Sequence, residues 1–131
     1  MSAEAHDPRT GQHLRFLETG ATTNGRLLSA ELRLAPSGWV PRHAHLRIDE
    51  RLEAVSGDVV FRVGRDEHRL RPGDAVDVPR RKAHTLRNVG ETEAVLRLEA
   101  RPARRTQGLM RAVFAVSRGL GALRPRRRPA G

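Results

Sequence analysis

The chain has 131 residues, enough for one domain with a modest core, and its apolar runs are too short to cross a bilayer. It contains no cysteine, which excludes disulfides and thiolate metal ligands, and its N-terminus lacks the apolar core of a signal peptide. These features predict a soluble, cytoplasmic protein without a transmembrane segment.

The net charge of +10 is unevenly distributed along the chain. Residues 1–100 carry 16 basic and 15 acidic side chains, whereas residues 101–131 carry nine arginines and no acid. We therefore divide the chain into a nearly neutral domain, residues 1–100, and a basic C-terminal segment, residues 101–131. The high isoelectric point belongs to that segment and says little about what the domain binds.

The first hundred residues consist of short stretches separated by Gly, Pro and Asp turns, a pattern typical of an all-β sandwich or barrel. A stretch rich in Leu and Phe near 14–17 predicts an edge strand. Apolar and polar residues alternate through 28–34, so one face of this strand is expected to be buried. Residues 64–67 predict a hairpin turn. Further strands are expected at 59–63, 68–70, 76–78, 84–86 and 94–98.

The C-terminal segment has a different pattern. Leucine and valine recur at helical spacing through residues 106–120, which predicts an amphipathic helix that packs on the barrel or across a dimer. Residues 124–131 are basic and interrupted by prolines, so we expect them to be disordered. Binding of nucleic acid or of an anionic membrane by this segment is an open alternative, although no interleaved aromatic residues support it.

Two glycine-bounded segments contain the residues that carry the chemistry. The first reads Gly38-x4-His43-x-His45-x4-Glu50-x6-Gly57, and the second reads Gly73-x5-Pro79-x4-His84-x3-Asn88. Together they supply three imidazole nitrogens and one carboxylate oxygen, a set suited to a divalent metal ion such as Fe, Mn, Ni, Co, Cu or Zn. Burying these four groups without a cation would be costly, so we favour metal binding over a metal-free polar cluster.

The period of a strand explains how these groups could converge. His43 and His45 are two residues apart, so both side chains face the same side of one strand. A turn would then place Glu50 on the inward face of the next strand, and His84 would arrive from a distant strand. Asp49 is a competing carboxylate, but strand alternation directs it to the opposite face, and the spacing favours Glu50.

The spacing of these motifs resembles that of the cupin superfamily, whose motifs read G-x5-H-x-H-x3,4-E-x6-G and G-x5-P-x-G-x2-H-x3-N. The likeness covers residues 13–100, and residues 58–72 separate the motifs, as in small single-domain bacterial members. The resemblance implies a double-stranded β-helix, or jelly-roll barrel, to which this chain would add its C-terminal amphipathic helix. By position, the resemblance assigns the metal ligands as His43, His45, Glu50 and His84.

Two departures from the family motifs are present. The first motif is one residue short before His43, and Arg81 stands where the second motif carries glycine. Arg81 lies in a basic run, Arg80 to Lys82. This run is either an ordinary solvated loop or a rim that attracts anions toward His84.

The resemblance also implies a function. Similar single-domain cupins oxygenate, isomerise or decarboxylate small oxygen-rich molecules, so we expect a small metal-dependent enzyme of the dioxygenase or isomerase/decarboxylase type. Glu50 is the only obvious base in the site and is therefore the candidate catalytic residue. The alternatives are a non-catalytic module that binds a metal or small ligand and an interaction protein that acts through its basic segment. Small cupins commonly pair through edge strands, so a homodimer is expected, with modest support from the stretch near 14–17.

Overall fold

The structure, a computed structural model, describes residues 4–44, 47–78 and 80–102. Those residues contain one short helix, α1 (Gly20–Thr23), and otherwise strands and turns. The strands are β1 (Glu4–Asp7), β2 (Gln12–Glu18), β3 (Leu28–Leu34), β4 (Trp39–His43), β5 (Asp49–Ser56), β6 (Val59–Val63), β7 (Asp66–Leu70), β8 (Ala75–Val78), β9 (His84–Asn88) and β10 (Ala94–Arg101). The predicted helix at 106–120, the basic residues after it and His45 lie outside the described residues.

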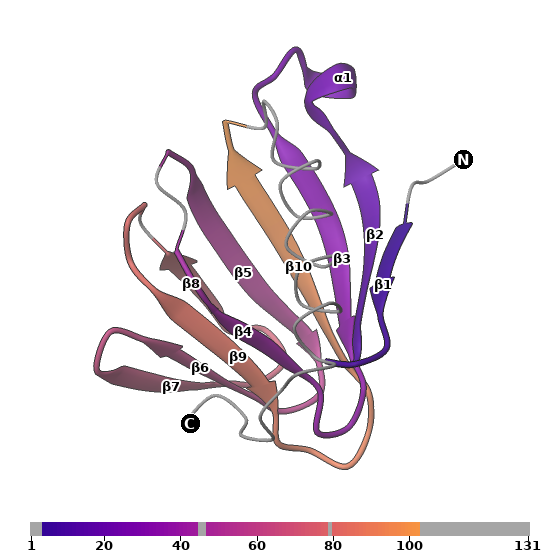
Figure 1. Ribbon diagram of the computed structural model, residues 1–131, viewed down its shortest axis with the longest axis vertical. Coiled ribbons are helices and arrows are strands. Elements are labelled where there is room, and N and C mark those ends of the chain that lie inside the picture. The colour runs from indigo at the N-terminus through magenta and orange to yellow at the C-terminus, as the bar shows by residue number, and fades with distance from the viewer. Residues whose placement is uncertain (1–3, 45–46, 79, 103–131) are drawn as a thin grey trace.

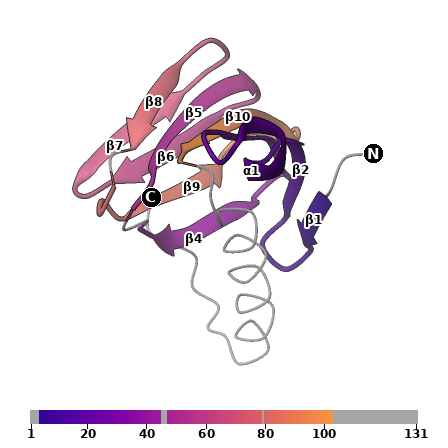
Figure 2. The same cartoon turned by 90° about the horizontal axis from the view of Figure 1, so that it is seen from above.

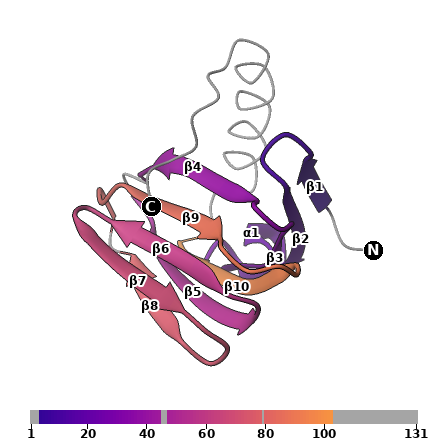
Figure 3. The same cartoon turned by 90° about the horizontal axis from the view of Figure 1, so that it is seen from below.

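The strands form two antiparallel sheets that lie as two layers (Figures 1–3). One sheet has the order β1-β2-β3-β10-β5-β8 and the other has the order β4-β9-β6-β7. From β3 to β10 the chain passes repeatedly from one sheet to the other, as a jelly roll requires. The predicted all-β, jelly-roll fold is therefore confirmed. The one helix of the described residues, α1, has four residues and cannot span a bilayer.

Strand alternation builds the core between the two sheets. In β5, Glu50, Leu52 and Ala54 are buried, while the residues between them are exposed. Strand β10 shows the same alternation, and the predicted inward face of residues 94–98 is confirmed. The opposite sheet supplies Phe61, which is 1% exposed. Glu50 thus begins the inward row of a core strand, as the sequence predicted.

Asn88 joins the two sheets at the end of the sandwich where β9 finishes. Its Nδ2 donates to the carbonyl oxygens of Leu34, Ala35 and Thr92 at 2.9–3.1 Å, and its Oδ1 accepts from the Gly90 amide at 2.9 Å. The side chain is buried, so these bonds replace water for both ends of the amide. Asn88 therefore stabilises a turn. Its amide group forms hydrogen bonds to backbone atoms that are distant from the ligand-type residues.

Two expectations about the strands were wrong. The stretch near 14–17 is not an edge strand, because β2 pairs with β1 on one side and with β3 on the other. Strand β1 escaped prediction because its sequence, EAHD, has no apolar alternation. The bounds of the turn at 64–67 were also wrong: β6 and β7 form the predicted hairpin, but Val63 pairs with Asp66, and Gly64, with φ 59°, allows a two-residue turn.

Candidate metal centre

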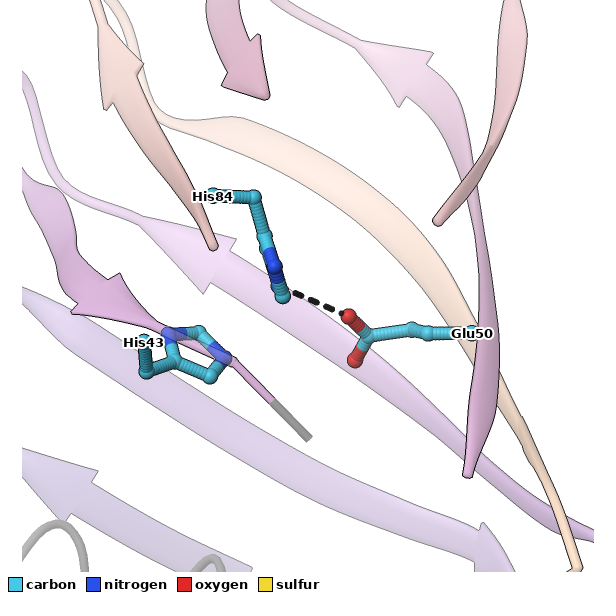
Figure 4. A group of neighbouring side chains, drawn as sticks. All are labelled: His43, Glu50 and His84. Atoms are coloured by element: carbon cyan, nitrogen blue, oxygen red, sulfur yellow. Dashed lines mark ion pairs between the residues drawn. The ribbon is translucent and has the colours of Figure 1, made fainter. Parts of the chain in front are cut away.

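Three of the four predicted ligand residues come together where β4 ends and where β5 and β9 begin; this end of the sandwich is here called the site end. The three strands can be followed in Figure 1. His43 is the last residue of β4 and His84 is the first residue of β9, and the two are direct cross-strand partners. Glu50 is the second residue of β5 in the opposite sheet. One ligand atom from each residue lies within 4.8 Å of the other two (Figure 4).

The cluster lies at the edge of the apolar core. His84 is 2% exposed and Glu50 is 6% exposed, whereas His43 is half-buried. The His43 and His84 rings are 4.2 Å apart between centroids, and Phe61 packs behind His84 at 5.9 Å. Two buried ionisable groups beside an aromatic ring have little access to water, so each depends on a specific partner.

Backbone carbonyl groups orient both imidazole rings. His43 Nδ1 donates to the Pro41 oxygen at 2.8 Å, and His84 Nδ1 donates to the Lys82 oxygen at 3.1 Å. A carbonyl oxygen can only accept, so the proton of each ring must be on Nδ1. Each Nε2 is then directed into the cluster, which is how metal-binding histidines are commonly held.

Glu50 and His84 form an ion pair within the cluster, with 3.0 Å between Glu50 Oε1 and His84 Nε2. Burial alone lowers the pKa of His84, but the hydrogen bond and charge of Glu50, together with the Lys82 carbonyl, raise that pKa above its ordinary value. Both nitrogens of His84 thus face hydrogen-bond acceptors, a carbonyl oxygen at Nδ1 and a carboxylate oxygen at Nε2, and this arrangement favours the protonated ring. A proton on Nε2 and a metal ion would therefore compete for the same side of His84.

The cluster fits a divalent metal ion. Two donors bound to one ion at about 2.1 Å each lie roughly 3–4 Å apart. The spacing of the three ligand atoms, all within 4.8 Å, is compatible with this requirement after small side-chain movements. Two imidazole nitrogens and a carboxylate also match the ligand preferences of first-row transition metals. The fourth predicted ligand, His45, is not among the described residues.

Asp49 faces away from the cluster, as strand alternation predicted. It is exposed, whereas its neighbour Glu50 is buried. Asp49 accepts three hydrogen bonds from Arg80, one from the backbone amide at 3.0 Å and two from the guanidinium at 3.2 and 3.3 Å. The side-chain and backbone bonds from Arg80 hold the pKa of Asp49 below its ordinary value. Asp49 thus anchors the loop before β9 to the start of β5.

The sequence did not indicate the groups that orient the site. The carbonyls of Pro41 and Lys82 are backbone atoms, and any residue type could have supplied them. Both lie two residues before the histidine they orient, but this spacing has no residue signature. The pairing of Arg80 with Asp49 could not be foreseen either, because 31 residues separate the two in sequence.

In sequence, the chain is similar to a curated protein, the tetracenomycin polyketide synthase protein TcmJ of Streptomyces glaucescens. The two are 34% identical over 97 residues, which is 72% of this chain and 64% of TcmJ. The chain therefore spans less than two thirds of that relative's length.

Two solved structures share the fold. KdgF from Halomonas sp. superposes with a TM-score of 0.69 and 20% identity over 78% of this chain and 88% of its own. An RmlC-like cupin from Shewanella frigidimarina superposes with a TM-score of 0.69 and 20% identity, over 82% of this chain and 89% of its own. At this identity the likeness concerns the fold alone. The family model described as a cupin domain matches residues 30–99, more than half of the chain and both histidine motifs. The chain belongs to the cupin family.

Proposed function

We propose that this protein is a small metal-dependent enzyme of the dioxygenase or isomerase/decarboxylase type, acting on a small oxygen-rich metabolite. Its metal ligands would be His43, His45, Glu50 and His84. The observation that supports this proposal best is the convergence of two oriented imidazoles and a buried carboxylate within 4.8 Å. A divalent ion bound there would act as a Lewis acid toward substrate oxygens or as a relay of electrons to dioxygen.

The protein groups have separable roles in this proposal. The Pro41 and Lys82 carbonyls accept hydrogen bonds from Nδ1 of His43 and His84, so Nε2 is the nitrogen of each ring that would bind a metal ion. Among the described residues, Glu50 is the one carboxylate of the cluster, and its Oε1 lies 3.0 Å from His84 Nε2. Glu50 can therefore accept a proton from a substrate that enters beside it. Phe61 and the buried core behind it keep water from that side of the cluster.

The similarity to TcmJ supports the proposal of an oxygen-rich substrate. TcmJ is described as a polyketide synthase protein, and polyketides carry closely spaced carbonyl and hydroxyl oxygens. Two such oxygens can chelate one metal ion. This reasoning concerns the class of molecule, because a shared fold does not determine the reaction.

Metal content is the first test. Untagged protein purified without chelators would be analysed by mass spectrometry beside a His43→Ala/His84→Ala double variant and a His68→Ala control. His68 is an exposed histidine of β7. We expect nearly one metal ion per chain in the wild type and in His68→Ala, and none in the double variant. Equal, trace metal in all three proteins would contradict the proposal.

A second experiment separates the enzyme from a non-catalytic binding module. Dioxygen consumption and substrate loss would be measured with a panel of oxygen-rich acids and polyketide-like phenols. Turnover that disappears in Glu50→Gln and in the metal-free protein would support an enzyme. Binding of metal and ligand without turnover would favour the module.

We further propose that the chain works as a cytoplasmic homodimer, with its metal chemistry confined to residues 1–100. The homodimer rests on the family resemblance alone, since the apolar stretch near 14–17 lies inside a sheet. Sedimentation equilibrium tests this part of the proposal, and a mass near 14.6 kDa would contradict it.

A further inference from the structure

Arg81 adopts a backbone conformation that arginine rarely adopts. Its φ is 72°, in the left-handed region where a Cβ atom crowds the backbone. The second cupin motif carries glycine at this position, and glycine has no Cβ to cause the crowding. Arg81 is exposed, so its side chain is not retained for packing in the core. Backbone strain of this kind is concentrated at ligand-binding and catalytic sites.

The neighbours of Arg81 hold it beside the candidate metal centre. On one side, Arg80 is fixed by three hydrogen bonds to Asp49, the residue before Glu50. On the other side, the Lys82 carbonyl accepts the Nδ1 proton of His84. The residues before and after Arg81 are therefore tied to the neighbourhoods of two different cluster members. This arrangement fixes where Arg81 emerges from the loop.

The charges at the site end are predominantly positive. The described residues of 42–51, 62–67 and 80–84 include eight Arg or Lys and four Asp or Glu. Arg80 is paired with Asp49, Arg62 with Glu67, and Arg51 with Asp77 on β8. Among these described residues, five cations have no ion pair with an acid: Arg42, Arg47, Arg65, Arg81 and Lys82. An excess of this kind attracts anions to the site end.

Arg81 is distinguished from the other four cations by its position. Arg42 precedes His43 on β4, beside an irregularity in the pairing with β9, and is exposed with an ordinary backbone φ. Arg65 belongs to the β6–β7 turn, which contacts the loop through the Gly64 amide and the Ala83 oxygen at 3.2 Å. Arg81 alone combines a strained backbone with a place between two anchored residues. Its guanidinium can bind a carboxylate through two parallel hydrogen bonds.

We propose that Arg81 binds the anionic group of the substrate, so that the natural ligand is a small molecule bearing a carboxylate or enolate. This inference rests on the proposed function, because the remaining oxygens of such a ligand would approach the metal centre. Arg81 then acts as a specificity-determining residue. The loop before β9 would be a built part of the binding site, with Arg80 as its anchor.

The test uses a charged probe and its neutral analogue. Pyruvate and methyl pyruvate would be titrated into the zinc-loaded and the zinc-free full-length chain, with dissociation constants measured from NMR shifts. The variants are Arg81→Gln, which removes the charge, and Arg81→Lys, which keeps it. The matched control is Arg71→Gln, since Arg71 is an exposed arginine in the β7–β8 turn at the opposite end of the sandwich. Zinc content would be measured for every variant.

We expect Arg81→Gln to weaken pyruvate binding about threefold to tenfold, with methyl pyruvate unchanged. Arg81→Lys should lose less pyruvate affinity than Arg81→Gln, and Arg71→Gln should bind pyruvate as the wild type does. Added salt should weaken pyruvate binding to the wild type more than binding to Arg81→Gln. No measurable pyruvate binding to the wild type, or equal losses for both probes in Arg81→Gln, would overturn the inference. If the chain takes up no zinc, the proposed function fails, while the zinc-free titration still decides whether Arg81 selects an anion.

Discussion

At the scale of single residues, the site depends on where two protons lie. His43 and His84 each donate an Nδ1 hydrogen bond to a backbone carbonyl, which leaves Nε2 of each ring for the cluster with Glu50. His84 Nε2 lies 3.0 Å from Glu50 Oε1, and the carboxylate raises the pKa of His84. The metal ion and the proton compete for the same nitrogen, and this competition makes metal binding sensitive to pH.

Metal affinity should therefore decrease as pH falls through the pKa of His84. That pKa is raised, so the proton is held more tightly than by a free imidazole, and the loss of affinity begins at a higher pH. Below the raised pKa, affinity should fall about tenfold per pH unit, because one proton must leave. Calorimetric zinc titrations in two buffers of different ionisation heat would count the protons released. In Glu50→Gln the release should begin at a lower pH, and identical curves would refute the role of Glu50.

The positive φ of Arg81 leads to a prediction about stability. Arg81→Gly should be more stable than Arg81→Ala by about 1 kcal/mol, because glycine tolerates the left-handed backbone. Arg65, in the nearby turn, does not have a positive φ, so Arg65→Gly should be less stable than Arg65→Ala by about 0.5–1 kcal/mol. Urea unfolding of the four variants gives both differences. The same sign at the two positions would contradict this account of the loop.

At the scale of elements, strand alternation was the most informative property of the sequence. It placed Glu50 inward and Asp49 outward on β5, and it identified the inward faces of β3 and β10. It could not say which strands become neighbours, because pairing across the sandwich leaves no mark on a single strand. The direct pairing of His43 with His84 is an example of such a long-range contact. Strand β1 was missed because it is short and polar.

The turn at Gly57 should be the least tolerant of substitution. Its φ is 96°, and a Cβ there would lie 2.7 Å from the Cα and Cβ of Ala94. Gly57→Ala should therefore cost about 2–3 kcal/mol of unfolding free energy, from strain and from overlap with β10. Gly64→Ala is the matched control, since Gly64 has φ 59° and a Cβ added there would meet nothing within 4 Å. It should lose only about 1 kcal/mol in urea unfolding, and equal losses would exclude steric overlap as the cause.

At the scale of the whole molecule, the candidate metal centre connects the two sheets. His43 and His84 belong to the four-stranded sheet, whereas Glu50 belongs to the six-stranded sheet. An ion held by all three would therefore cross-link the layers at the site end. The sequence motifs predicted which residues would group together. The distances and orientations within the group depend on how the strands pair, and the motifs do not contain that information.

Metal binding should stabilise the entire fold. At a free zinc concentration 100 times the dissociation constant, the gain in unfolding free energy is about 2.7 kcal/mol, provided that the unfolded chain does not bind zinc. Thermal unfolding with and without zinc would measure it. The His43→Ala/His84→Ala variant should show no shift, and a shift equal to that of the wild type would place zinc elsewhere on the chain.

X-ray absorption at the zinc K-edge would show whether His43, His45, Glu50 and His84 hold one metal ion together. We predict three imidazole nitrogens and one carboxylate oxygen at about 2.0–2.2 Å in the zinc-loaded wild type. One imidazole should be lost in each of His43→Ala, His45→Ala and His84→Ala. An imidazole count that is unchanged by these substitutions would contradict the account.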